Sequence, residues 1–543
     1  MRGPLSLCVL LALLAWIPSI FSSGFSYDDR EAIFENPVVT GELPLDAAFD
    51  RDYWHHRGDA GHYRPLATVS LRIDHALWGD DARGYHATNV ALHAGVVLLL
   101  GLWLQRRLPN GLPWLGLALF AAHPVLADSV AWLSGRTSML SALGGLIGGV
   151  LLTRSHSRFT CTLAAGFGLL LALCAKEDGI VFALIYLVSE KKRRGAILVG
   201  SSLALCAYAA LRANALGHAF PSAPGAPLAA TPLLERLHIG GFAILEGLRL
   251  AVFPFRYPPH YRVQDLAPPV SLASSIAAGC AWLVLLAALV RPLWKPTTIR
   301  LSAAFAAAVA LPVLQLIPAG EVFAPRFLYP VLLFAVPFVG AVLQFFVRQS
   351  STRALLFALL LCICVPMAWA RSTVYKTRGS YRLAVLALHP DDSRSWNGLG
   401  HDYFEQNRIQ AARAAWEHAI EIDPEYSRPW TNLGISYFTR GEERLALPYF
   451  NEAVETGPQN PIAHVWLARA RLQRGQSSEA CALFERAARL APGMSEAWTG
   501  LAEAYFQLDD LPRARAAVER ASELDPTAKA VLETWSRIMG AGL

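Results

Sequence analysis

The stretch WNGLGHDYFEQNRIQAARAAWEHAIEIDP, residues 396–424, decides the fold of the last third of the chain. Its pattern recurs with a period of 34 residues, and a proline closes each copy. These prolines are Pro390, Pro424, Pro458, Pro492 and Pro526. Small residues at fixed positions let two helices approach closely, and the proline ends the second helix. The period therefore predicts a stack of paired helices.

The pattern resembles the tetratricopeptide repeat (TPR), which has a large residue early in its first helix. The residues at this position are Trp396, Trp430, His464 and Trp498. We expect residues 393–543 to form four such repeats and a capping helix over 527–540, because a stack needs a cover for its apolar end. Residues 372–392 are expected to be a linker.

The composition of the preceding residues is that of a membrane protein. Only 17% of the 543 residues are charged, against about 25% in soluble domains, and the deficit falls in the first 370. A span needs about 20 apolar residues. The candidate spans cover 4–22, 87–105, 112–122, 137–153, 159–175, 178–189, 195–211, 271–290, 301–318, 328–347 and 354–370.

Basic clusters beside the apolar runs predict how these spans are oriented. They are Arg106–Arg107, Arg154 with Arg158, Lys191–Arg194, Arg291 with Lys295 and Arg300, and Arg348 with Arg353. If all are cytoplasmic, eleven spans fit and residues 237–254 do not cross. The N-terminus then lies inside and the repeats outside. The net charge of +6 is explained by these clusters, so we expect no nucleic-acid partner.

Two features of the N-terminus leave alternatives. Residues 4–22 could be a cleaved signal peptide or a retained span, and either places residues 24–86 outside the cytoplasm. This first loop holds twelve acidic and six basic residues. All eight cysteines lie in apolar stretches or in a repeat helix, and none has a metal-binding spacing, so neither a disulfide framework nor a zinc site is expected.

The motif FSYDD places Asp28 and Asp29 directly after the first apolar run. Two adjacent carboxylates repel, so one tends to have a raised pKa. Such a group suits a general base that acts on a hydroxyl at the membrane surface. The alternative is an ordinary acidic start of a loop.

Further polar residues occur where spans are expected to begin or end. Arg64 lies in YRPL, and His86, Asn89 and His93 share one face of the next helix. Polar residues in membrane helices are costly, so they are either functional or paired. An interhelical hydrogen-bond seam is the alternative.

Three more segments carry charge at expected turns outside the cytoplasm. The first holds His123, Asp128 and Arg136; this arginine could meet a phosphate or pair with Asp128. The second is Lys176–Glu177–Asp178, which could also be a salt-bridged hairpin tip. The third is Glu321 with Arg326 and Tyr329, where a guanidinium suits a lipid phosphate or anchors the helix at the interface.

These charges gather at one predicted face, as a transferase that uses a lipid-linked sugar phosphate would need. The acceptor hydroxyl must lose a proton, and Asp28 could take it. The leaving phosphate is stable as an anion, so neutralisation by Arg and Lys suffices.

The motifs described so far are FSYDD with Asn36, YRPL, YHATNVALH, HPV…W…GR, the Lys–Glu pair and the late Glu…Arg…Tyr. Together they resemble the motifs of the transmembrane and TPR-repeat-containing O-mannosyltransferases, which are GT-C membrane glycosyltransferases. The resemblance covers nearly the whole chain. It implies an all-α, GT-C-like membrane domain over 1–371 that precedes the TPR α-solenoid.

The resemblance also implies a chemistry. A sugar passes with inversion from a polyprenyl- or dolichyl-phosphate donor to a Ser or Thr hydroxyl, with Asp28 as base and Asp29 at the second acidic position. Arg64, His86, His123, Arg136, Lys176, Glu177 and Arg326 match further family positions. Asp128 departs from the family, which commonly has Glu there, and four repeats are fewer than in most animal members.

The expected partners are membrane lipids, the lipid-phosphate sugar donor, and a protein acceptor or partner held by the first helices of the repeats. The Ala- and Gly-rich sequence favours a bacterial inner membrane. No metal site is demanded, although a divalent metal could assist. The alternatives are a non-catalytic membrane-anchored TPR scaffold, which does not explain the double Asp, and a transporter or flippase, which would place charges at the bilayer midplane.

Overall fold

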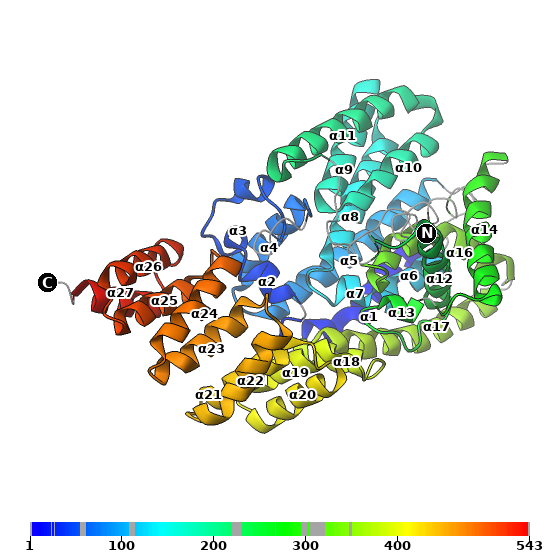
Figure 1. Cartoon of the computed structure of the whole chain (residues 1–543). Coiled ribbons are helices and arrows are strands. Elements are labelled where there is room, and N and C mark those ends of the chain that lie inside the picture. The colour runs from blue at the N-terminus through cyan, green and yellow to red at the C-terminus, as the bar shows by residue number, and fades with distance from the viewer. Residues whose placement is uncertain are drawn as a thin grey trace. The chain divides into compact units, whose positions relative to one another are not determined.

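The computed structural model describes residues 3–22, 24–26, 28–54, 61–107, 114–219, 228, 230–266, 268–294, 302, 306, 321–346 and 350–540. Within these residues the chain is all-helical and has no strand, as predicted (Figure 1). The chain forms two compact units, Met1–Tyr381 and Arg382–Leu543.

The C-terminal unit contains the four predicted helix pairs and a final helix. They are α19 (Ser393–Glu405) with α20 (Ile409–Ile422), α21 (Ser427–Phe438) with α22 (Glu443–Thr456), α23 (Pro461–Gln473) with α24 (Ser477–Leu490), α25 (Ser495–Gln507) with α26 (Leu511–Leu524), and α27 (Lys529–Gly540). The recurring small residues set the spacing within each pair. A Cβ atom on Gly500 would lie 2.2 Å from the Phe484 ring, so only glycine allows this contact.

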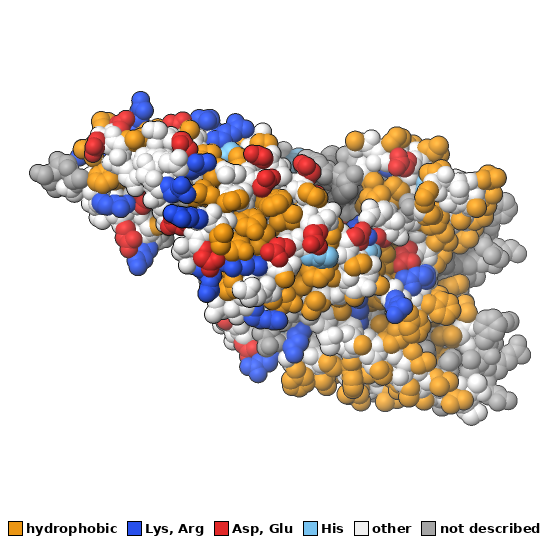
Figure 2. Space-filling view, turned by 60° about the horizontal axis from the view of Figure 1, so that its bottom comes forward, with side chains coloured by type: hydrophobic (Ala, Val, Ile, Leu, Met, Phe, Trp, Pro, Cys, Tyr) orange, Lys and Arg blue, Asp and Glu red, His pale blue; other side chains and the backbone are white. Residues whose placement is uncertain are grey.

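The N-terminal unit is a bundle of apolar helices. Its longer helices are α1 (Gly3–Ile20), α5 (Ala82–Gln105), α8 (Arg136–Arg154), α9 (Arg158–Ala175), α11 (Arg194–Leu216), α12 (Leu233–Val252), α14 (Leu272–Trp294), α16 (Leu328–Phe346) and α17 (Ser350–Ser372). Helix α1 packs against α5, α6 (Trp114–Ala122) and α17. Side chains such as Phe159, Leu163 and Phe167 on α9 are exposed, and Figure 2 shows broad hydrophobic areas of this kind.

Among the described residues, five helices are long and apolar enough to cross a membrane: Ala82–Gln105, Arg136–Arg154, Arg158–Ala175, Arg194–Leu216 and Pro325–Leu343. Two predicted short spans form α6 (Trp114–Ala122) and α10 (Val181–Ser189), of nine residues each, against the roughly 20 residues of a full span. The predicted span 301–318 lies almost entirely outside the described residues. The number eleven therefore stays a prediction.

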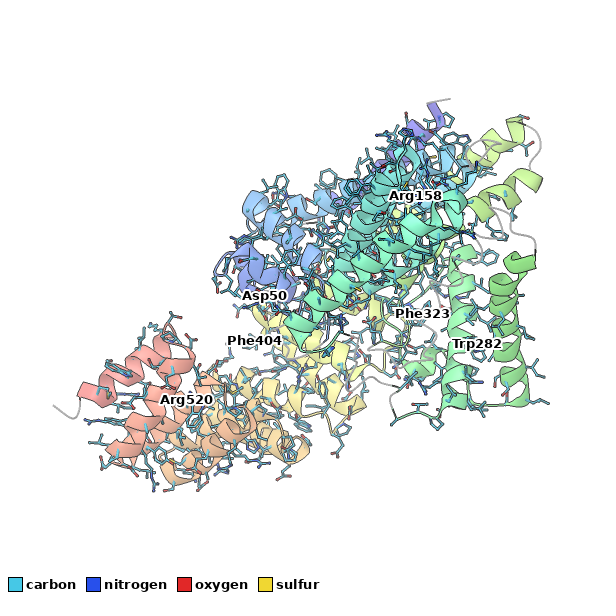
Figure 3. The ribbon with its side chains drawn as sticks, turned by 90° about the horizontal axis from the view of Figure 1, so that it is seen from above. Asp50, Arg158, Trp282, Phe323, Phe404 and Arg520 are labelled. Carbon is cyan, nitrogen blue, oxygen red and sulfur yellow. The ribbon has the colours of Figure 1, made fainter. Side chains whose placement is uncertain are left out.

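Three of the five basic clusters meet at one end of the bundle, and the side chains of the other two, at 291–300 and 348–353, lie outside the described residues. Arg106 donates to the Thr153 hydroxyl at 2.6 Å, Arg107 donates to the Ser189 carbonyl at 2.6 Å, and Arg193 donates to the Ser155 carbonyl. The first loop lies elsewhere, because Asn214, near the far end of α11, donates to Asp50 at 3.2 Å. Figure 3 shows Arg158 and Asp50 well apart along this bundle.

The first loop folds into short helices instead of running free. They are α2 (Asp29–Ile33), α3 (Pro37–Thr40), η1 (Leu45–Phe49) and α4 (Pro65–Trp78). Tyr53, Leu71 and Tyr85 are buried in a common apolar cluster. This packing fixes the loop residues against α5 and α8, where the polar motifs lie.

The segregation of the two ends predicts opposite sidedness in a membrane. Glu42→Cys, in the first loop, should react with a membrane-impermeant maleimide added to intact cells, whereas His156→Cys, between α8 and α9, should react only after permeabilisation. Glu455→Cys, in the repeats, should react as Glu42→Cys does. All three positions are exposed. Labelling of His156→Cys in intact cells would contradict the arrangement.

Candidate active site

Asp29 ties the first loop to the turn before α8. One of its carboxylate oxygens accepts hydrogen bonds from the backbone and hydroxyl of Ser26 at 3.0 and 3.1 Å, and the other accepts the same pair from Ser134 at 2.9 Å each. Burial raises its pKa, and these four hydrogen bonds oppose that shift. A raised pKa is expected for one of Asp28 and Asp29 because adjacent carboxylates repel. For Asp29 the largest cause is burial. Both carboxylate oxygens of Asp29 are thus occupied in joining Ser26 to Ser134.

Asp28 is held next to this clamp. It precedes α2 and its side chain is buried. Its charge acts on the buried Tyr53 hydroxyl, whose pKa is raised first by burial and then by Asp28, whereas Arg64 and Arg136 lower it. Asp28, Arg64 and Arg136 are therefore close enough to Tyr53 for their charges to act on its hydroxyl.

Glu177 joins the first loop to α11. Its two oxygens lie 3.8 Å from Nε of Arg64 and 3.3 Å from Nη1 of Arg212. Arg212 is fully buried and also donates to the Gly61 carbonyl at 2.7 Å. Arg212 is not predictable as a site residue from the sequence, because a single arginine near the end of an apolar helix looks like a membrane-interface residue.

Arg326 approaches the same place from the chain segment before α16. It forms an ion pair with Glu321, which the sequence analysis did not predict, and its guanidinium lies 4.8 Å from the Trp132 ring centre. Burial raises the pKa of Glu321, but Arg326, then His260 and Arg64, lower it below its usual range. The influence of Arg64 on Glu321 shows that the two arginines face one cluster.

Lys176 lies beside this cluster, at the turn between α9 and η4 (Glu177–Ile180). Its ammonium group is 3.1 Å from Asp178, donates to Ser138 at 2.9 Å, and lies 5.8 Å from the Phe327 ring centre. The salt-bridged turn is thus present for Lys176 and Asp178, whereas Glu177 reaches away to the two arginines.

Arg136 has a partner that the sequence did not suggest. It lies 2.7 Å from Asp74 on α4, not in an ion pair with Asp128, and both side chains are buried. Thr88 also donates to Asp74, at 2.8 Å. Through Asp74, Arg136 on α8 is therefore connected to α4 and α5.

The polar face of α5 is an interhelical seam. Asn89 donates to the carbonyls of Val130 and Trp132 at 3.2 and 3.1 Å, and His93 contacts Tyr329 and the Ala121 carbonyl at 3.0 and 3.1 Å. His86, on the same face, is buried beside them. Asn89 thus holds α5 against the turn that carries Trp132, and His93 connects α5 to Ala121 and Tyr329.

His123 and Asp128 lie on the other side of that turn. Val125 donates to Nδ1 of His123, so Nε2 carries the proton that it donates to the Ala251 carbonyl at 3.1 Å. Asp128, on α7 (Ala127–Val130), accepts a hydrogen bond from the Tyr375 hydroxyl. Burial raises the pKa of Asp128 to about 6, although Arg371 lowers it. His123 thus connects this turn to Ala251 on α12, and Asp128 connects it to Tyr375.

The ten predicted site residues thus divide into two groups. Asp28, Arg64, Lys176, Glu177 and Arg326 converge on one charged cluster, to which the structure adds Tyr53, Arg212 and Glu321. Asp29, His123, Asp128 and Arg136 connect the elements that carry the cluster, and His86 is buried next to them.

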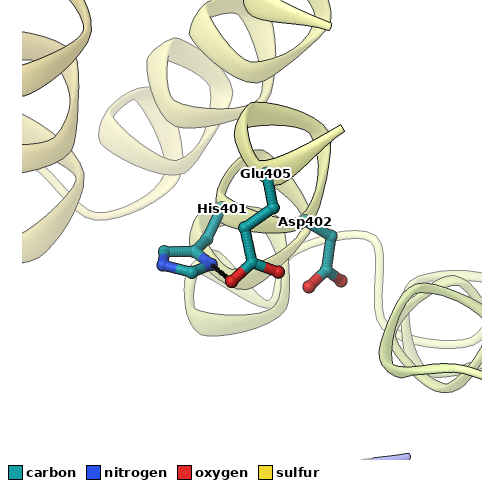
Figure 4. Close-up of side chains that lie close together, drawn as sticks. All are labelled: His401, Asp402 and Glu405. Atoms are coloured by element: carbon teal, nitrogen blue, oxygen red, sulfur yellow. Dashed lines mark ion pairs between the residues drawn. The ribbon is translucent and has the colours of Figure 1, made fainter. Parts of the chain in front are cut away.

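A group of side chains of the kinds that bind metal ions lies in the repeats, not in the charged cluster described above. Among the described residues, His401, Asp402 and Glu405 on α19 are the one such group of three (Figure 4). Asp402 already forms an ion pair with Arg382, and His401 and Glu405 lie on the exposed face. We assign no metal to this group.

Comparisons with known proteins address both units. Residues 400–441 match a family model described as TPR repeat, and residues 471–533 match one described as tetratricopeptide repeat. The paired helices of the C-terminal unit are TPR repeats. Among solved structures, the chain is similar to YrrB, a TPR protein with an unusual peptide-binding site, at 20% identity and a TM-score of 0.25, over 29% of this chain and 80% of that one.

The curated relatives are protein O-mannosyl-transferases, so the resemblance predicted above is confirmed. Tmtc1 of Drosophila melanogaster is 33% identical over 188 residues, which are 33% of this chain and 21% of the relative. TMTC2 of Mus musculus is 36% identical over 24% of this chain and 16% of its own. The Caenorhabditis elegans protein F38B6.6 is 29% identical over 33% of this chain and 27% of its own. The chain thus matches a quarter or less of most of these relatives' length.

The buried pair of Arg136 and Asp74 gives a stability prediction. Arg136→Ala should lower the free energy of unfolding by about 3–5 kcal/mol, because it leaves a buried carboxylate without its partner. The double variant with Asp74→Ala should lose less than the sum of the single changes. Unfolding of the detergent-solubilised protein measures this cycle, and additive losses would contradict it.

Asp128 gives a pH prediction. A folded-state pKa of about 6 exceeds the ordinary value of about 3.9, so the folded protein holds the proton more tightly. The stabilising contribution is present below about pH 4 and is lost as pH rises through 6, by up to about 3 kcal/mol. In Asp128→Asn, the free energy of unfolding should therefore change less with pH between about pH 4 and 6. An unchanged pH slope in the variant would refute the assignment.

Proposed function

We propose that this protein is a membrane glycosyltransferase that moves a sugar such as mannose from a polyprenyl-phosphate donor to the hydroxyl of a Ser or Thr residue. The observation that carries the proposal is the convergence of Asp28 with Arg64, Glu177, Glu321 and Arg326 at one end of an apolar bundle. The similarity to the named O-mannosyl-transferases supports the same reaction class.

In this mechanism Asp28 is the general base. It accepts the proton of the acceptor hydroxyl, whose oxygen attacks the anomeric carbon as the bond to the donor phosphate breaks. The electron pair of that bond leaves with the polyprenyl phosphate. Attack from the face opposite the phosphate inverts the anomeric centre. Asp29 contributes by holding α2, and therefore Asp28, against Ser134.

The leaving phosphate requires positive charge. Arg64 and Arg326 supply guanidinium groups whose side chains are 18% and 20% exposed, so they are accessible from one side. Glu177 and Glu321 hold these groups before substrate binds, and a phosphate that replaces either carboxylate forms charge-assisted hydrogen bonds with the same donors. Lys176 and Arg212 add positive charge nearby. The exposed apolar helices are suited to the lipid tail of the donor.

A second part of the proposal concerns location. We infer that the cluster lies on the extracytoplasmic side, because three basic clusters gather at the other end of the bundle and such clusters favour the cytoplasm. The repeats would then hold an acceptor protein on the same side, in a bacterial inner membrane or its equivalent. Neither the fold nor this chemistry requires a divalent metal.

The test is sugar transfer in membranes that lack a native enzyme. Membranes that contain the wild-type protein should label protein from a radioactive polyprenyl-phosphate mannose, and Asp28→Asn should lower the rate by at least about 100-fold, the range of general-base contributions. Asp46→Asn is the matched control, because Asp46 is exposed in the same loop. Equal rates for Asp28→Asn and the control would remove Asp28 from the mechanism. Absence of labelling with several sugar donors would favour the membrane-anchored scaffold.

A further inference from the structure

A groove of about 650 Å³ lies in the C-terminal unit at the junction of the third and fourth repeats. Helices α24, α25 and α26 line it. The lining residues are Glu485, Ala488, Arg489, Pro492, Trp498, Leu501, Tyr505, Arg513, Ala516 and Ala517. A volume of this size can hold a group larger than water. Because two of its three helices are second helices, it differs from the contact face of first helices that the sequence predicted.

A comparison of the second and fourth repeats shows that a side chain fills the corresponding place in the second repeat. Position by position, Trp498, Tyr505 and Ala517 of the fourth repeat correspond to Trp430, Tyr437 and Tyr449 of the second, 68 residues earlier. In the second repeat the side chain of Tyr449 occupies the equivalent place. Its ring stacks on Tyr437 at 5.4 Å with an angle of 3°, and lies 6.2 Å from Trp430. The chain thus fills this place with its own aromatic ring in one repeat.

In the fourth repeat, alanine stands where the filling tyrosine would be. Ala488 also replaces the larger Ile420 of the corresponding helix. Trp498 and Tyr505 therefore line an open groove with the same aromatic walls that enclose Tyr449. Aromatic rings gain from stacked and edge contacts beyond the area they bury, so these walls favour another ring.

We propose that this groove binds an aromatic side chain of a partner polypeptide in the place that Tyr449 fills in the second repeat. The rim indicates the flanking residues. Arg489 and Arg513 are 63% and 68% exposed beside the groove and form ion pairs with Glu485 at 3.6 Å and Asp510 at 3.4 Å. The Tyr505 hydroxyl also donates to Glu485, at 2.7 Å. Acidic residues next to the partner's aromatic residue would replace these partly exposed carboxylates on the two arginines. The inference does not depend on the proposed transfer reaction.

The chain itself supplies substitutions that keep the fold. The third repeat has His464 at the position of Trp498, and its Nε2 donates to the Pro458 carbonyl at 3.1 Å, as Nε1 of Trp498 donates to Pro492 at 3.0 Å. Trp498→His therefore preserves this hydrogen bond and removes an aromatic wall. Ala517→Tyr places the second repeat's filling residue into the groove. Trp430→His is the matched control, because its groove is already filled.

The experiment uses the full chain in lipid nanodiscs and a phage library of random 12-residue peptides. Peptides selected on the wild-type protein should share an aromatic residue with acidic neighbours, and a synthetic copy should bind measurably by fluorescence anisotropy. Trp498→His and Ala517→Tyr should each weaken its binding at least tenfold, whereas Trp430→His should leave it unchanged. Selected peptides without a common aromatic residue, or equal binding to all four proteins, would overturn the proposal. If Ala517→Tyr does not fold, the difference in peptide binding between Trp498→His and Trp430→His decides the question by itself.

Discussion

Charge inside an apolar bundle must be paired, and this requirement organises the end of the molecule that carries the candidate site. Leaving one buried charge without its partner costs several kcal/mol. Asp74 therefore meets Arg136, and Glu177 meets both Arg64 and Arg212. Each of these pairs joins segments that are far apart in the sequence, so the ion pairs and the helix arrangement determine each other.

The same requirement separates residues that hold the site from residues available for chemistry. Asp29 uses both carboxylate oxygens to clamp Ser26 and Ser134, and Arg136 is buried against Asp74. Arg64 and Arg326 keep partial exposure and have carboxylate partners that a phosphate anion can replace. A pair that is accessible on one side can exchange its anion, whereas a fully buried pair cannot do so without unfolding its surroundings.

The two units follow different physical rules. In the membrane unit, polar residues at a few positions fix the packing of apolar helices, as the contacts of Asn89 and His93 show. In the repeats, small residues fix the spacing of each pair, and the large positions vary from copy to copy. That variation has a consequence at Ala517, where a missing ring opens a groove between walls that elsewhere enclose Tyr449.

By itself, the sequence determined the all-α class, the four repeats and their exact period, because helix pairing repeats small and large residues at regular positions. It also singled out Asp28, Arg64, Glu177 and Arg326 as candidates, because charged residues beside apolar runs are conspicuous. Tertiary structure decided which charges meet. Asp74 and Arg212 gave no distinctive local signal, and the pairing of Arg136 with Asp74 over Asp128 depends on how α4 packs against α8. The groove at the fourth repeat likewise required the fold, since an alanine in a helix is ordinary until its neighbours leave the space beside it open.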